Sequence, residues 1–213
     1  MLGVALVDLG MGNLHSVERA LARGAADASL ACTVTRTGDP DALRRADKIV
    51  VPGQGAFRDC AAALARGLGD ALRAEIAAGK PYLGICLGLQ ALFAESEEAP
   101  GAPGLGVFPG KVARLTPSEG VKIPHMGWNR VALLRSGAGP LAVFDGEEPY
   151  FYFVHSYHAV PDDPALVAAI TEHGPHRVTA AVQRDNVTAT QFHPEKSQDA
   201  GLRLLASFLS QNG

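Results

Sequence analysis

The chain has 213 residues, 47% of them hydrophobic, and a mean hydropathy of +0.07, so it can bury a substantial core as one domain over residues 1–213. Its formal net charge of −3 and pI of about 6.1, without long runs of Lys or Arg, argue against a nucleic-acid surface and favour small-molecule chemistry. No apolar stretch approaches the roughly 18 residues expected of a membrane span, so we expect no membrane segment.

The first half of the chain alternates strand-like apolar runs with helical periodicity, the pattern of βαβ units in a parallel sheet. We expect helices that begin with Asn13 as N-cap, near Phe57, at about 69–79 and after Cys86, the last running through Phe93 into the acidic segment 95–98. The expected strands cover 2–8, 30–35, 48–51 and 81–85. The first of these lacks a basic flank, so we interpret it as a buried strand and not as a signal peptide.

The second half reads mostly as strands joined by turn residues. The expected strands cover about 106–115, 128–134, 150–160, 165–172, 178–183 and 187–192, and a final helix covers about 199–209. The fold class that follows is α/β: an open, mostly parallel sheet with helices on both faces and an antiparallel extension in the C-terminal half.

The pentapeptide Gly84-Ile85-Cys86-Leu87-Gly88 has the form of a nucleophile elbow, because it lies between an apolar run and a helical pattern. The following helix would point its free N–H groups at the sulfur and stabilise a thiolate. The alternative is that Cys86 is a small buried hydrophobic residue, as we expect for Cys32 and Cys60. The three cysteines match no zinc spacing and suggest no disulfide framework, which fits a reducing cytosol.

A candidate base lies far downstream, in Gln191-Phe192-His193-Pro194-Glu195. Pro194 favours an extended conformation at His193, and in an extended chain His193 and Glu195 project to the same side. An imidazole beside a carboxylate supplies the base and the orienting group of a triad. Taken alone, His193 could equally cap a strand end and Glu195 could be solvated.

Two further glycine-containing loops follow expected strands. The loop Pro52-Gly53-Gln54-Gly55 offers the Gly53 N–H as an oxyanion donor beside the Leu87 N–H, or it is a plain turn that needs positive φ. The loop Gly10-Met11-Gly12 resembles a dinucleotide fingerprint but fails at the third glycine, where His15 stands. Histidine pairs occur at 155 and 158 and at 173 and 176, without a third ligand at convincing spacing. We therefore expect neither a metal nor a cofactor.

Together these motifs resemble the class I (triad) glutamine amidotransferases, which have a Gly-x-Cys-x-Gly elbow, an earlier Pro-Gly-x-Gly loop and a late His-Pro-Glu. The resemblance implies a flavodoxin-like sheet. Within the family, four segments are similar to the glutaminase subunits of imidazole glycerol phosphate synthases, and the resemblance spans nearly the whole chain. These segments are Asp8-Leu9-Gly10-Met11-Gly12-Asn13-Leu14, Pro124-His125-Met126-Gly127-Trp128-Asn129, Tyr152-Phe153-Val154-His155-Ser156-Tyr157 and His193-Pro194-Glu195-Lys196-Ser197.

The resemblance implies that glutamine is hydrolysed to glutamate and ammonia. Cys86 would attack the side-chain amide, His193 would move the proton, and Glu195 would orient the imidazole. The ammonia would pass, within a heterodimer, to a cyclase subunit of the (βα)₈-barrel type that forms imidazole glycerol phosphate in histidine biosynthesis.

The resemblance also implies roles for residues that carry no signal of their own. The implied substrate-binding residues are Gly55, Gln90, Glu98, Ser156 and Tyr157, and the implied partner-interface residues are Asn13, Trp128, Tyr152 and Lys196. Without the resemblance, Glu98 would be a solvated helix end. Two alternatives remain: the glutaminase of another amidotransferase, in pyridoxal phosphate, anthranilate or purine synthesis, and a non-enzymatic regulatory subunit.

Overall fold

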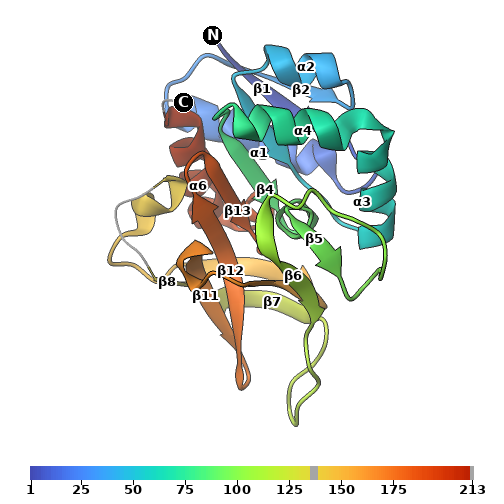
Figure 1. The fold of residues 1–213 in the computed structure, drawn as a ribbon. Helices are drawn as coiled ribbons and strands as arrows, with labels where there is room; N and C mark the ends of the chain where they lie inside the picture. The colour runs from blue at the N-terminus through green and yellow to red at the C-terminus, as the bar shows by residue number, and fades with distance from the viewer. Residues whose placement is uncertain (135–138, 212–213) are drawn as a thin grey trace.

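An eight-stranded sheet forms the centre of the computed structural model, which describes residues 1–134 and 139–211 (Figure 1). The strand order is β2-β1-β3-β4-β13-β12-β11-β8. The first five are parallel: β2 (Cys32–Thr37), β1 (Leu2–Val7), β3 (Lys48–Val51), β4 (Tyr82–Ile85) and β13 (Val187–Thr190). Each of the last three pairs antiparallel with the strand before it: β12 (His176–Arg184), β11 (Val167–His173) and β8 (Ala132–Leu133). The predicted α/β fold class, with its antiparallel extension, is confirmed.

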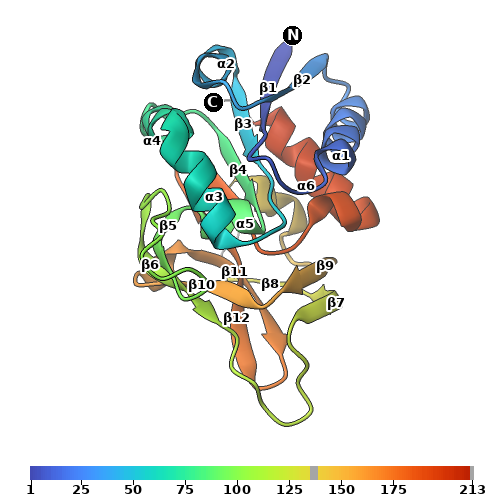
Figure 2. The same ribbon diagram turned by 90° about the vertical axis from the view of Figure 1, so that its right-hand side faces the viewer.

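Helices cover both faces of the parallel part, as Figure 2 shows. On one face lie α1 (Leu14–Asp27) and α6 (Gln198–Ser210), and on the other lie α2 (Pro40–Arg45), α3 (Phe57–Ala63) and α4 (Gly69–Ala77). Side chains of β1 alternate between the two cores, since Leu6 packs with α1 and α6 while Val7 packs with α3 and α4. Asn13 caps α1 as predicted, accepting a hydrogen bond from the Ser16 N–H at 3.2 Å.

Two smaller sheets lie beyond the carboxyl ends of the parallel strands. One has the order β10-β6-β5 and the other pairs β7 with β9. Their strands are β5 (Phe93–Ser96), β6 (Phe108–Arg114), β7 (His125–Arg130), β9 (Tyr150–His155) and β10 (Tyr157–Pro161). The expected strand 150–160 is thus two strands, because the chain leaves one sheet and enters the other at Ser156.

Short helical turns complete the described elements. A kinked segment at Leu64–Leu68, in which Gly67 has a φ of +97°, joins α3 to α4, and 3₁₀ turns cover Pro140–Phe144, Pro164–Leu166 and Pro194–Lys196. No helix in the described part of the chain is both long and apolar enough to span a bilayer.

The helix expected from Cys86 to the acidic segment 95–98 is wrong beyond its first turn. Helix α5 covers only Leu87–Gln90, and the chain then forms β5. The Ala91 and Leu92 carbonyls accept hydrogen bonds from the N–H groups of Leu105 and Val107, at 2.7 and 2.8 Å, instead of continuing a helical ladder. Gly104 allows this approach, because a Cβ there would lie 2.0 Å from the Phe93 carbonyl oxygen. Gln90 and Glu98 therefore do not share a helix face.

Helix α6 is fixed at both ends. The buried Lys48 ammonium donates to the carbonyls of Phe208 at 2.7 Å and Gln211 at 2.5 Å, where helix carbonyls lack partners. Near the other end, Gly201 packs so closely on the 3₁₀ turn 194–196 that a Cβ would lie 1.8 Å from the Pro194 carbonyl oxygen. Helix α6 thus connects the start of β3 to the segment that carries Glu195.

Candidate active site

Cys86 lies at the carboxyl end of β4, in the sharp turn before α5, with φ +54° and ψ −99°. A non-glycine residue in such a conformation costs on the order of 1–3 kcal/mol and persists only where its surroundings enforce it. The flanking glycines allow those surroundings: a Cβ at Gly88 would lie 1.9 Å from the Val51 carbonyl oxygen, and one at Gly84 would lie 2.6 Å from the Gly88 carbonyl oxygen. The predicted elbow geometry is therefore present.

His193 follows β13, the strand beside β4, so the parallel register brings it next to Cys86. Its Nδ1 lies 2.8 Å from Glu195 Oε1, and the two side chains are only 1% and 4% exposed. Burial alone would lower the pKa of His193, but Cys86 and Glu195 together outweigh it and raise this pKa to about 9. The Glu195 carboxylate thus holds an imidazole whose raised pKa suits it to carry a proton at neutral pH.

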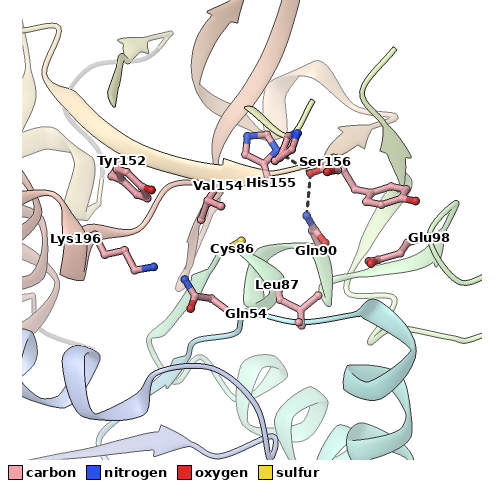
Figure 3. Close-up of a pocket in the computed structure, with 13 residues that line it drawn as sticks. Gln54, Cys86, Leu87, Gln90, Glu98, Tyr152, Val154, His155, Ser156 and Lys196 are labelled. Atoms are coloured by element: carbon pink, nitrogen blue, oxygen red, sulfur yellow. Dashed lines mark hydrogen bonds between the residues drawn. The ribbon is translucent and has the colours of Figure 1, made fainter. Parts of the chain in front are cut away.

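A cavity of about 490 Å³ opens above Cys86 (Figure 3). Nine of the residues that line it were predicted for the site or the partner interface: Gly55, Cys86, Leu87, Gln90, Glu98, Tyr152, Ser156, Tyr157 and Lys196. Gln54, which lies between Gly53 and Gly55, also lines it. Figure 3 shows Lys196 and Glu98 on opposite sides of the sulfur. Asn13 and Trp128 do not line the cavity, nor does Gly53, which lies beneath Leu87.

Two glutamine amides connect the cavity wall to the sulfur. Gln90 Nε2 donates to the Tyr157 carbonyl at 3.0 Å and to Gln191 Oε1 at 3.3 Å, and Gln191 Nε2 donates to Cys86 Sγ at 3.5 Å. Gln191 was not among the residues predicted for the site. Its signal was its place two residues before His193 in an extended segment. The extended chain predicted from His193 to Glu195 is wrong beyond His193, because Pro194–Lys196 forms a 3₁₀ turn, and this turn brings Glu195 beside His193.

Glu98 reaches the site from the turn after β5. Its Oε2 accepts a hydrogen bond at 3.0 Å from the N–H of Phe57, the first residue of α3. This carboxylate lines the cavity while it is held by a backbone group. Although the predicted helix is wrong, Glu98 still lies in the cavity together with Gln90.

The loop Pro52-Gly53-Gln54-Gly55 does not present an oxyanion hole in this structure. The Leu87 N–H donates to the Gly53 carbonyl at 3.4 Å, so an acceptor lies where an oxyanion would bind. The Gln54 nitrogen faces away, against Gly12, at which a Cβ would lie 3.1 Å from it. The peptide between Gly53 and Gln54 therefore presents its carbonyl, and not its N–H, to the place where the oxyanion would form.

Three of the predicted interface residues form one aromatic and cationic cluster. Trp128 is 47% exposed and packs edge-on against Tyr152 at 6.3 Å between ring centroids, and Lys196 Nζ lies 5.7 Å from the Tyr152 ring. Asn13 is exposed at the start of α1. Within residues 1–134 and 139–211, no group of three or more His, Cys, Asp or Glu side chains is arranged to hold a metal ion.

Comparison with known proteins gives the class to which this fold and site belong. The family described as glutamine amidotransferase class-I matches residues 5–211. The chain therefore belongs to the class I glutamine amidotransferase family.

Its curated relatives include the imidazole glycerol phosphate synthase subunit HisH of Methylococcus capsulatus, 53% identical over 98% of this chain and 96% of that protein. The HisH of Methanothermobacter thermautotrophicus is 46% identical, over 97% of each.

Solved structures support the fold alone, since their sequence identity to this chain is low. A crystal structure of a glutamine amidotransferase superposes with a TM-score of 0.72 at 20% identity, covering 98% of this chain and 99% of that one. The structure of PurLQS from Thermotoga maritima gives a TM-score of 0.75 at 19% identity, covering 98% and 97%.

Proposed function

We propose that this chain is the glutaminase subunit of an imidazole glycerol phosphate synthase, with residues 1–213 forming one amidotransferase domain. The observation that carries the glutaminase activity is that Cys86, which lines a cavity with polar groups, lies next to the buried pair of His193 and Glu195. The kind of synthase rests on the likeness to the HisH subunits along nearly the whole chain.

In the proposed reaction the Cys86 thiolate attacks the side-chain amide carbon of glutamine. His193, as the imidazolium, gives its proton to the leaving nitrogen, and ammonia departs from a thioester. His193 then takes a proton from water, which attacks the thioester and releases glutamate. The buried Glu195 carboxylate holds the Nδ1 proton and stabilises the imidazolium throughout.

The α-amino-acid end of glutamine requires partners for two charges. We assign the α-ammonium to Glu98 and the α-carboxylate to the backbone N–H groups of Ser156 and Tyr157, with Gln90 and Gly55 completing the wall. All five line the same cavity as Cys86.

The ammonia is proposed to pass to a separate cyclase subunit of the (βα)₈-barrel type, bound in a cytoplasmic heterodimer. The docking surface would include Asn13, Trp128, Tyr152 and Lys196. The exposed aromatic ring of Trp128 supports this assignment, since aromatic side chains are enriched at interfaces.

We further propose that docking of the partner turns over the peptide between Gly53 and Gln54. This rotation would withdraw the Gly53 carbonyl from the Leu87 N–H and direct the Gln54 N–H toward the oxyanion, so the donor in this proposal is the Gln54 N–H and not the Gly53 N–H expected from the sequence. A missing oxyanion donor costs roughly 10²–10³ in rate, so one peptide is enough to silence the isolated chain.

Ammonia release from glutamine, measured with and without a HisH-compatible cyclase subunit and its nucleotide ligand, tests both proposals. We expect a slow rate for the chain alone and stimulation of at least about 10² in the complex. No hydrolysis in either state would overturn the glutaminase assignment. An isolated chain as fast as the complex would overturn only the peptide rotation.

A further inference from the structure

Strand β7 presents two different faces. Met126 and Trp128 point outward and are 62% and 47% exposed, whereas His125 is 3% exposed and Asn129 is half-buried. This alternation follows from the period of two in a strand. The outward face belongs to the proposed docking surface, so the inward side chains lie directly beneath it.

The inward side chains begin a line of three hydrogen bonds. Asn129 Nδ2 lies 3.1 Å from His125 Nε2, His125 Nδ1 lies 3.0 Å from His155 Nε2, and His155 Nδ1 lies 2.9 Å from the Tyr157 carbonyl oxygen. The line thus crosses from β7 to β9 and ends at the first residue of β10, in the wall of the glutamine cavity.

The two ends of this line determine the tautomer of each ring. Asn129 Oδ1 accepts from the Arg130 N–H at 2.8 Å and Nδ2 donates to the Glu172 carbonyl at 2.7 Å, which fixes the orientation of the amide. The amide nitrogen can only donate and the Tyr157 carbonyl can only accept. His125 must therefore carry its proton on Nδ1, and so must His155.

Such a line requires both rings to be neutral, and their surroundings keep them so. Burial, aided by His173 stacked on the ring at 4.2 Å, lowers the pKa of His125 to about 4. Burial, with further contributions from His125, His158 and His193, lowers the pKa of His155 to about 3. At neutral pH both rings are therefore uncharged.

The Tyr157 carbonyl at the end of the line also accepts from Gln90 Nε2, whose neighbour Gln191 donates to the Cys86 sulfur. We propose that Asn129, His125 and His155 are positioning residues, a relay of fixed tautomers that holds the Ser156–Tyr157 bend and the Gln90 amide in place for glutamine. The relay rests on the proposed function and specifies how β7, the strand beneath the docking surface, is connected to the substrate wall.

The His125→Phe variant tests this relay, because phenylalanine keeps the packing on Phe153 and removes both hydrogen bonds. In the assembled synthase we expect the KM for glutamine to rise about three- to tenfold, the effect of losing a hydrogen bond, with a smaller change in kcat. Alkylation of Cys86 by iodoacetamide, which lacks the amino-acid end of glutamine, should proceed at the wild-type rate. The matched control is His173→Phe, which keeps a ring stacked on His125 but lies outside the relay.

The nitrogen chemical shifts of the histidine rings give a readout independent of catalysis. In the full chain we expect both His125 and His155 to carry the proton on Nδ1, the form that is the minor tautomer of free histidine. In His125→Phe, His155 should keep this proton, because the Tyr157 carbonyl still accepts it, while the chemical shift of its Nε2 should change as that nitrogen loses the His125 donor. A proton on Nε2 in the wild type, or an equal rise in KM in His173→Phe, would overturn the relay. A wild-type complex that released no ammonia would instead overturn the proposed function, while the ring shifts would still decide the relay.

Discussion

The elbow at 84–88 and the glycine loop at 52–55, which meet at Leu87, differ in their readiness for catalysis. The elbow at 84–88 is already in the geometry for nucleophilic attack, with backbone atoms packed where side chains would be. The loop at 52–55 is not, since the Gly53 carbonyl occupies the Leu87 N–H. Residues 84–88 are all buried, whereas in the loop at 52–55 Gly53 is buried, Gln54 is half-buried and Gly55 is exposed.

This difference separates the two requirements of catalysis. The proposed nucleophile and base are held in place by the strained turn and by the buried pair of His193 and Glu195. The proposed stabilisation of the oxyanion depends on the Gly53–Gln54 peptide, whose carbonyl accepts from the Leu87 N–H in this structure. We infer that control acts on the second requirement and leaves the first unchanged.

Removing the nucleophile should have the largest effect. Replacing a member of a catalytic triad lowers turnover by about 10⁴–10⁶, so Cys86→Ala should abolish ammonia release from glutamine. Synthesis from added ammonia by the assembled complex should survive. Cys60→Ala is the control, because this thiol lies in the core and burial raises its pKa to about 12. If Cys86→Ala retained glutamine hydrolysis while Cys60→Ala lost it, Cys86 would not be the nucleophile.

The base should be more sensitive than the carboxylate that orients it. His193→Ala removes proton transfer altogether, whereas Glu195→Gln leaves an imidazole that is held less well, so kcat should fall further in the first variant. The reverse order of kcat values would contradict these roles.

The same pair predicts the alkaline limb of the pH profile. Because the pKa of His193 is raised to about 9, the imidazolium is present below that pH and is lost as the pH rises through it. Activity should therefore decline near pH 9 in the wild type. Loss of the Glu195 charge in Glu195→Gln should move this decline to lower pH, which kcat/KM measured as a function of pH would show. A decline at the same pH in both proteins would mean that Glu195 does not raise the pKa of His193.

The loop at 52–55 can be tested by removing a single N–H group. Gln54→Pro deletes the donor that rotation of the peptide would supply, so the partner-stimulated rate should fall by about 10²–10³ toward the unstimulated rate. Gln54→Ala keeps the N–H and should retain stimulation. Partner binding, measured by titration, should be similar for both variants. Full stimulation of a folded Gln54→Pro variant would exclude the rotation.

The smallest effect is expected at Glu98, far from the reacting amide. Glu98→Gln retains an acceptor for the Phe57 N–H but loses the charge that pairs with the α-ammonium. Because such a contact binds ground and transition states about equally, KM should rise, by roughly tenfold or more, and kcat should change little. Glu97→Gln is the matched control, since Glu97 pairs with Lys111 and does not line the cavity. Equal KM values for the two variants would remove Glu98 from the substrate site.

Local signals predicted the parallel sheet and the elbow well, because apolar strands and flanking glycines act over a few residues. The helix predicted through Phe93 failed for a non-local reason: Gly104, eleven residues later, lets another segment take the carbonyls that a helix would need. Helix α2 was missed because it has only six residues, although Asp39 caps it and Pro40 begins it.

Sequence cannot reveal the orientation of the Gly53–Gln54 peptide, since both orientations leave the same residues in the same order. The polar connections of His125, His155 and Gln191 were equally hidden, because each depends on a partner from a different strand. The triad could be predicted from the sequence because His193 and Glu195 stand two residues apart and Cys86 lies in a recognisable turn.

The attachment of α6 has a practical consequence for anyone who labels or shortens this protein. Lys48 holds the Phe208 and Gln211 carbonyls, and the opposite end of the same helix packs on the turn that carries Glu195. A helix of 13 residues spans about 20 Å, so a fusion or truncation that pulls its last turn away from Lys48 would be transmitted along a rigid rod. Tags placed there risk loosening the catalytic base, whereas the exposed hairpin turn around Gly120 offers a safer attachment point.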